Sequence, residues 1–259
     1  MCGIIKTELL KLKRYHILWA GILLMLFTVL LTLFNSTAED GTVWTFPILV
    51  EQVIKNNTTT IFPMCITLIA GYMIAREEKD NTLKIILTIP ISYRKLLFGK
   101  LIVCGFISVF FGIMCALFTT CAEIIVTFPE FSVGAVLQAF IQLPMNCLFL
   151  YIAVLPIIAI SAQMQNGNMI GAIVAFVYGY GGMFAASSKL LMNIYPITAS
   201  LGLINYRSYD AAVNWNIPIC AFSMLIMIIL TMLFVFLIRD KEPKTVVKKK
   251  IRALPKKGW

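Results

Sequence analysis

Long apolar runs alternate with short polar segments along the whole chain, and this pattern predicts a helical membrane protein. A helix needs about 20 apolar residues to cross the hydrocarbon core of a bilayer. Six runs approach that length, at about 17–34, 60–75, 101–125, 136–160, 169–186 and 217–238. We therefore expect an all-α polytopic membrane protein, in which residues 1–259 form one transmembrane domain with six transmembrane helices.

Three of these runs carry irregular features. The run at 60–75 is only just long enough to span a bilayer, and residues 35–58 before it are interpreted as an external loop. Pro144 and Pro156 lie in the fourth run, where proline is expected to kink a helix or break its ends. The first run follows the basic segment KLKRYH, as the apolar part of a signal peptide would. We expect it to be retained, because its apolar core of about 18 residues is too long for a signal peptide.

The segments outside the runs have distinct patterns. Residues 1–16 place Ile5, Leu9 and Leu12 at helical spacing with basic residues off that line, which predicts an interfacial helix on the membrane surface. Residues 187–216 form a semi-apolar, aromatic external segment, read as a re-entrant or interfacial helix pair. Residues 239–259 form a basic tail, which we expect to rest against anionic lipid headgroups and which needs no nucleic acid to explain it.

The distribution of basic residues predicts the orientation in the membrane. Lys and Arg number 22, and the chain has a formal net charge of +10. With six spans, the N-terminal segment, the 76–100 loop and the tail lie on one side, and only Lys55, Lys189 and Arg207 lie on the other. Since basic loops stay in the cytoplasm, we expect both termini and the 76–100 loop to be cytoplasmic.

Cysteine and histidine usage argues against metal or disulfide chemistry. The seven cysteines are odd in number, form no CxxC pair and, apart from Cys2, lie in apolar runs, so we interpret them as small packing residues. His16 is the only histidine, which argues against a histidine-based metal centre.

Polar residues inside the runs are candidates for a translocation path. Glu123 is the one ionisable residue within a predicted span, near its outer end. Gln138, Gln142 and Asn146 recur every four residues and would form a stripe along one face of the fourth helix. The stripe would either form hydrogen bonds between helices or line a polar path, and the pattern leaves both interpretations open.

Small residues recur along the fifth run and predict close helix packing. They are Gly167, Gly171, Ala175 and Gly179. Such a stripe lets two helix backbones approach closely. The contact would lie either within one subunit or at a dimer interface.

The densest charged segment lies between the second and third runs. In AREEKDNTLK, residues 75–84, six of ten residues are charged. Asp80 and Asn81 can cap a short helix that begins at Thr82 and ends before Pro90. Ser92 can cap a second helix, which leads into the third run. A capped amphipathic helix in a cytoplasmic loop is an element that a soluble partner can bind.

This segment resembles the cytoplasmic segment of type 2 ABC transporter permeases, and the layout of the whole chain is similar to that family. The matching residues are Glu78, Thr82, Lys84, Leu87, Pro90, Ser92, Arg94, Lys95, Gly99 and Lys100. The chain departs from the usual pattern with Asn81 where glycine is usual and with Tyr93 between serine and arginine. Asparagine also tolerates left-handed geometry, so the first departure is mild.

The resemblance implies that residues 76–100 form a coupling segment, which docks on separate cytoplasmic ABC ATPase subunits, two per transporter. The residues implied in this contact are Glu77, Glu78, Asn81, Thr82, Leu83, Leu87, Pro90, Arg94 and Lys95. The chain has no GxxxxGK[ST] phosphate loop, so no cofactor is expected on it, and ATP and Mg are expected on the partner. A second permease, identical or related, would complete the path.

Within this family, the chain looks similar to the permeases of bacitracin-resistance and lantibiotic-immunity exporters. That similarity implies export of antimicrobial peptides from a bacterial plasma membrane. Two alternatives stay open: a non-transporting accessory or sensor subunit, and a type 2 permease for a drug or a lipid-linked polysaccharide. An intramembrane enzyme or an ion-coupled carrier is disfavoured, because the runs contain no catalytic constellation and no chain of carboxylates.

Overall fold

The computed structural model describes residues 2–12, 16–38, 43–79, 92–164, 167–207 and 213–237, and within them all regular structure is helical. The helices are α1 (Cys2–Leu12), α2 (Ile17–Ser36), α3 (Phe46–Asn56), the π-helix η1 (Asn57–Ile61), α4 (Phe62–Lys79), α6 (Tyr93–Val126), α7 (Val133–Ser161), α8 (Gly167–Ala185), α9 (Leu191–Ile194), α10 (Pro196–Leu203) and α11 (Ile217–Leu237). Six helical segments are long and apolar enough to cross a membrane. The predicted fold class and the six spans are confirmed.

The second span is longer than the sequence pattern indicates. α3, η1 and α4 follow one another without a break, so the helical segment begins at Phe46, in the stretch interpreted as an external loop. Pro47 lies in the first turn of α3, where its missing N–H costs nothing. Leu49, Val53 and Ile54 are fully buried. The loop interpretation of 46–58 was therefore wrong, because the polar residues of this stretch are part of an amphipathic helix.

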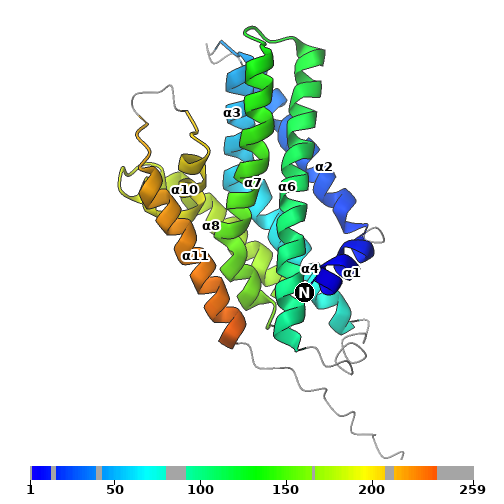
Figure 1. Ribbon diagram of the computed structural model, residues 1–259. Helices are drawn as coiled ribbons and strands as arrows, with labels where there is room; N and C mark the ends of the chain where they lie inside the picture. The colour runs from blue at the N-terminus through cyan, green and yellow to red at the C-terminus, as the bar shows by residue number, and fades with distance from the viewer. Residues whose placement is uncertain are drawn as a thin grey trace, which may run out of the picture.

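The α6–α7 hairpin forms the centre of the bundle. In Figure 1 these two helices run side by side, with α2 beside α6 and α11 beside α7. Their backbones meet at Gly112, where an added Cβ would lie 2.4 Å from the Cα of Pro144. Only glycine fits this approach without a shift. α7 continues through both of its prolines and is largely buried.

Two short helices fold residues 187–207 into the bundle. α9 and α10 follow α8, and α10 packs against both α7 and α11. Nearly every residue of α10 is buried, so it is an internal element of the bundle. Trp215 donates its indole N–H to the carbonyl of Tyr206 (2.7 Å), which closes the segment before α11.

The polypeptide places several distant segments at one end of the bundle. α1, the C-terminal end of α4, the N-terminal end of α6 and the C-terminal end of α11 all lie there (Figure 1). Since α1 and the C-terminal end of α11 lie at the same end, the chain between them crosses the bundle an even number of times. Both described ends of the 76–100 segment, in α4 and α6, lie at this end of the bundle, whereas residues 80–91 lie outside the described residues.

Candidate functional site

A buried lysine lies where α1, α4 and α6 meet. Lys100, in the second turn of α6, is only 2% exposed. Its ammonium donates to the backbone carbonyl of Met73 (2.9 Å) and to Oε2 of Glu8 (3.1 Å), and Oε1 of Glu77 lies 3.3 Å away. Three oxygens thus surround an ammonium that has three protons to donate. Lys100 therefore connects all three helices.

A second lysine completes the cluster, which we call the ionic network: Glu8, Lys11, Glu77 and Lys100. The ammonium of Lys11 lies 2.6 Å from Oε1 of Glu8 and 2.7 Å from Oε1 of Glu77. The side chains of Glu8 and Glu77 are almost completely buried, whereas that of Lys11 is 37% exposed. Burial of a charge is costly unless it is paired and hydrogen-bonded, and here each carboxylate faces both ammonium groups.

The pairing also shifts the pKa of two of these groups. Burial alone would raise the pKa of Glu8, but the charges and hydrogen bonds of Lys100 and Lys11 outweigh it and hold that pKa below its ordinary value. For Lys11, burial would lower the pKa, but hydrogen bonds to Glu77 and Glu8 outweigh it and raise that pKa. Both shifts favour the charged forms of Glu8 and Lys11.

α1 docks on α6 by shape as well as by charge. An added Cβ at Gly99 would lie 2.7 Å from Cγ2 of Ile4, so the absence of a side chain at Gly99 lets α1 approach α6 closely. The docked face of α1 carries Ile4, Ile5 and Glu8, whereas Leu9 is exposed. Glu8 rather than a leucine is the most buried side chain of the described part of α1. Contact of Leu9 with the membrane surface stays a prediction.

The ionic network joins both ends of the predicted coupling segment. Glu77 precedes residues 80–91 and Lys100 follows them, so the two sides of the segment are held together through Glu8 and Lys11 of α1. Sequence reasoning selected Glu77 but missed Glu8, Lys11 and Lys100 as a set. One signal was present: Glu8 is the only carboxylate among the first sixteen residues.

The other residues predicted for the coupling contact are only partly described. Arg94 is half-buried and Lys95 is exposed in the first turn of α6. The side chain of Glu78 and all of Asn81, Thr82, Leu83, Leu87 and Pro90 lie outside the described residues. Their contact with an ATPase stays a prediction.

The three residues of the predicted polar stripe of α7 differ in their burial and in their hydrogen bonds. Gln138 is exposed, whereas Gln142 donates to the carbonyl of Ile204 (3.0 Å). Asn146 is fully buried, donates to Oγ1 of Thr58 in η1 (2.9 Å) and lies 3.4 Å from the hydroxyl of Ser200 in α10. Gln142 and Asn146 therefore form the hydrogen bonds between elements that one interpretation predicted. A role in a translocation path stays a prediction.

Glu123 stabilises the turn between α6 and α7. Its Oε1 accepts the backbone N–H of Phe128 (2.9 Å), and its backbone carbonyl accepts the N–H of Thr127 (2.7 Å), which has a positive φ of 53°. The side chain is 3% exposed. This geometry gives Glu123 a structural role at the end of α6.

The small residues of α8 pack inside the subunit. An added Cβ at Gly171 would lie 2.7 Å from the Cβ of Ser161, and one at Gly179 would lie 2.8 Å from the carbonyl oxygen of Thr59. Gly167 and Ala175 are buried in the same helix. The stripe thus brings α8 close to α4, η1 and the end of α7, which favours the internal contact over a dimer interface.

Comparison with known proteins agrees with this architecture. The family model described as ABC-2 family transporter protein matches residues 4–182, which run from α1 into α8 and include all four residues of the ionic network. No curated protein matches the chain. Because the family model covers more than half of the chain, the protein belongs to the ABC-2 family of membrane transporter proteins.

Proposed function

We propose that this protein is the membrane-spanning permease subunit of an ATP-driven exporter, which removes antimicrobial peptides of the lantibiotic or bacitracin type from the plasma membrane of a bacterium. Membership of the ABC-2 family supports the permease role and implies association with an ABC ATPase subunit. The peptide substrate is supported by the overall resemblance to resistance and immunity permeases.

The observation that carries the coupling role is the ionic network. It holds α1, α4 and α6 together at the two ends of residues 80–91. A displacement of this segment would then move three helices at once, because coupling travels through rigid elements that are packed together. α6 in turn packs against α2 and α7, so the motion would reach the centre of the bundle.

The proposed transporter needs partners on the cytoplasmic side. Two ATPase subunits would hold ATP and Mg, and their closure would push on the coupling segments. A second permease, identical or related, would form the other half of the path. In this arrangement the ionic network, both termini and the coupling segment are cytoplasmic, in agreement with the basic residues that flank them.

The test is a double substitution in the coupling segment, Leu83→Asp with Leu87→Asp. The expected result is loss of resistance to a lantibiotic and to bacitracin, with normal membrane insertion and reduced co-purification of the ATPase, because two charges would replace the apolar face of the predicted coupling helix. The control is Val43→Asp, an exposed residue before α3, which should leave resistance unchanged.

The outcomes separate the parts of the proposal. Unchanged resistance in the double variant would overturn the coupling assignment. If deletion of the chain leaves sensitivity to both peptides unchanged while an ATPase still co-purifies, the permease role stands and the substrate is another compound, such as a drug or a lipid-linked polysaccharide. If no ATPase associates, the chain is an accessory or sensor subunit.

A further inference from the structure

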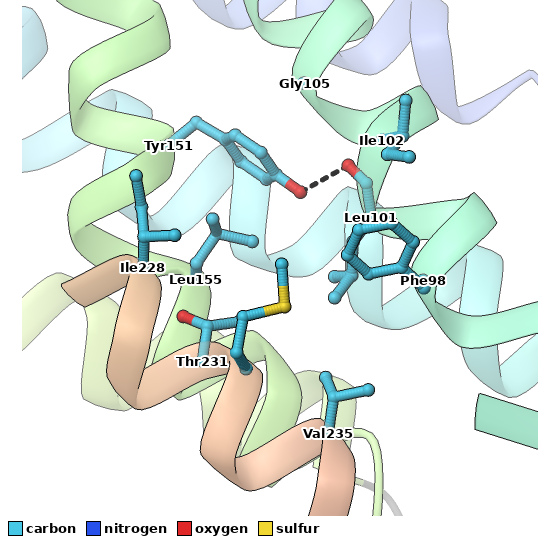
Figure 2. Close-up of a pocket in the computed structure, with 10 residues that line it drawn as sticks. Phe98, Leu101, Ile102, Gly105, Tyr151, Leu155, Ile228, Thr231 and Val235 are labelled. Atoms are coloured by element: carbon cyan, nitrogen blue, oxygen red, sulfur yellow. Dashed lines mark hydrogen bonds between the residues drawn. The ribbon is translucent and has the colours of Figure 1, made fainter. Parts of the chain in front are cut away.

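An apolar cavity lies between α6, α7 and α11, at the same end of the bundle as the ionic network. Its volume is about 160 Å³. Figure 2 shows Phe98 and Ile102 of α6, Tyr151 of α7, and Thr231 and Val235 of α11 around it. Nothing in the proposed export function uses this cavity.

The two hydroxyl groups in the wall are already engaged. Tyr151 donates to the carbonyl of Leu101 (2.5 Å), the bond drawn in Figure 2, and Thr231 donates to the carbonyl of Met227 (2.7 Å). A buried water needs two to four polar partners, so this wall holds water poorly. An apolar cavity of about 150 Å³ stays dry and takes up an apolar guest such as benzene. The apolar wall of the cavity therefore favours a hydrocarbon ligand over water.

The cavity is open toward the surface of a membrane-spanning segment. Ile228 is 40% exposed and Met232 is 37% exposed, whereas Val235, deeper in the wall, is 6% exposed. A surface of this kind on α11 faces bilayer hydrocarbon when the helix spans the membrane. The apolar guest that reaches this opening from the bilayer is the acyl chain of a lipid.

A lysine lies on the same face of α6, toward the end of the helix. Lys95, Phe98 and Ile102 are separated by three and four residues, which places them on one helix face, and Lys95 is exposed. Seven residues of helix separate Lys95 from Ile102 by about 10 Å. The polar region of one leaflet is roughly 5–7 Å thick, so a headgroup at Lys95 leaves its acyl chain level with the cavity.

We propose that this cavity binds an acyl chain of an anionic phospholipid, with the lipid phosphate held at Lys95. The apolar wall, the opening on α11 and the position of the lysine carry the proposal together. It goes beyond the proposed export function and does not depend on the exported substrate.

The test is photolabelling of the full-length protein in vesicles of phosphatidylglycerol that contain a trace of phosphatidylglycerol with a diazirine on its acyl chain. Labelled residues are mapped by mass spectrometry. The expected result is label concentrated on the lining residues of α6 and α11. Label spread evenly over the exposed residues of α11, such as Phe222 and Ile229, would overturn the proposal.

Matched variants make the test specific for the cavity. Val235→Phe fills it and should remove most of the label from the lining, whereas Leu233→Phe, at an exposed position of the same helix, should not. Gly105→Ala is a milder variant, because the added Cβ would make an ordinary 3.5 Å contact with Tyr151, and it should reduce the label partly. Label unchanged in both filling variants would overturn the proposal.

The headgroup is tested by comparison with labelled phosphatidylcholine, which is zwitterionic. The wild-type lining should label more strongly with phosphatidylglycerol, and Lys95→Gln should abolish that preference. Lys189→Gln, an exposed lysine that follows α8, is the control and should retain it. Equal labelling of the wild type by both lipids would overturn the selection of an anionic lipid, because phosphatidylcholine carries the same phosphate and differs by its compensating positive charge.

Discussion

Two sets of ion pairs in this protein have similar distances but different surroundings. In the ionic network, Lys100 lies 3.1 Å from Glu8 and both side chains are almost completely buried. Away from α1, Arg207 lies 3.1 Å from Glu51 of α3; the side chain of Arg207 is 38% exposed and that of Glu51 is 10% exposed. The distance between the charges therefore does not distinguish the two sites, and neither does the exposure of the outer cation, which is 37% for Lys11 and 38% for Arg207. What distinguishes them is Lys100, a second ammonium that is itself buried.

The two sites therefore have different structural roles. Water reaches Arg207 and screens its pair with Glu51 in part, so this pair is worth less than one in which both charges are buried. Arg207 follows α10 with a positive φ of 51°, and the hydroxyl of the neighbouring Tyr206 donates to the carbonyl of Glu51, so this pair helps to seat a loop on α3. The ionic network instead joins three helices on both sides of residues 80–91, and loss of one partner would leave a buried charge unpaired.

The largest predicted effect follows from removal of the central ammonium. Lys100→Met leaves the buried Glu8 and Glu77 with only Lys11 as a neutralising charge within the network, and loss of one partner of a buried ion pair costs about 3–5 kcal/mol. We expect a much lower melting temperature of the detergent-purified protein and release of α1. Lys189→Met, at an exposed position after α8, is the control. Equal melting temperatures for the two variants would show that the network is not structural.

A smaller effect is expected on acidification. The pKa of Glu8 is lowered in the folded protein, so its contribution to stability is present above its ordinary value of 4.5 and is lost as the pH falls through the lowered pKa. A spin label at the exposed Leu10 should therefore become mobile only below pH 4.5.

The control for this titration is Glu8→Gln, in which no acid step from this residue is possible. Its spin label should show the same mobility across the acid range. Lys11 sets the limit at alkaline pH. Its pKa is raised in the folded protein, so its contribution to stability is lost only when the pH rises above 10.5, its ordinary value. A wild-type α1 that loosens near neutral pH would contradict the assigned pKa directions.

The smallest effect is expected at the pair of Arg207 and Glu51. Arg207→Gln should lower the free energy of unfolding by less than Lys100→Met does, because water reaches Arg207 and screens the pair in part. The measurement is the melting temperature of the variant beside that of Lys100→Met. A loss at Arg207 as large as that at Lys100 would remove the distinction between the two sites.

The sequence predicts those parts of the structure that depend on local pattern. The six spans follow from hydropathy, which acts along a single helix. The close packing of α8 follows from the spacing of Gly167, Gly171 and Gly179, but its partner does not, because spacing says nothing about which helix lies opposite. α3 was missed because Glu51 and Lys55 made an amphipathic helix resemble a polar loop.

The ionic network could be predicted only in part. Glu77 was selected because it belongs to a dense local run of charges. Its contacts with Lys11 and Lys100 depend on how α1 docks against α4 and α6, and the pairing of Lys100 with Glu8 spans 92 positions in the chain. A pattern of apolar and polar residues within one helix does not show which residues of a distant helix it contacts.

The measurement that tests the central claim most directly is isolation of the tagged protein from its native membranes in mild detergent, with the co-purifying proteins identified by mass spectrometry. The account predicts an ATPase with a phosphate-binding loop in stoichiometric amount, cross-linked to residues 76–100. Absence of any such ATPase, repeated after cross-linking in intact membranes, would contradict the coupling role of this end of the molecule.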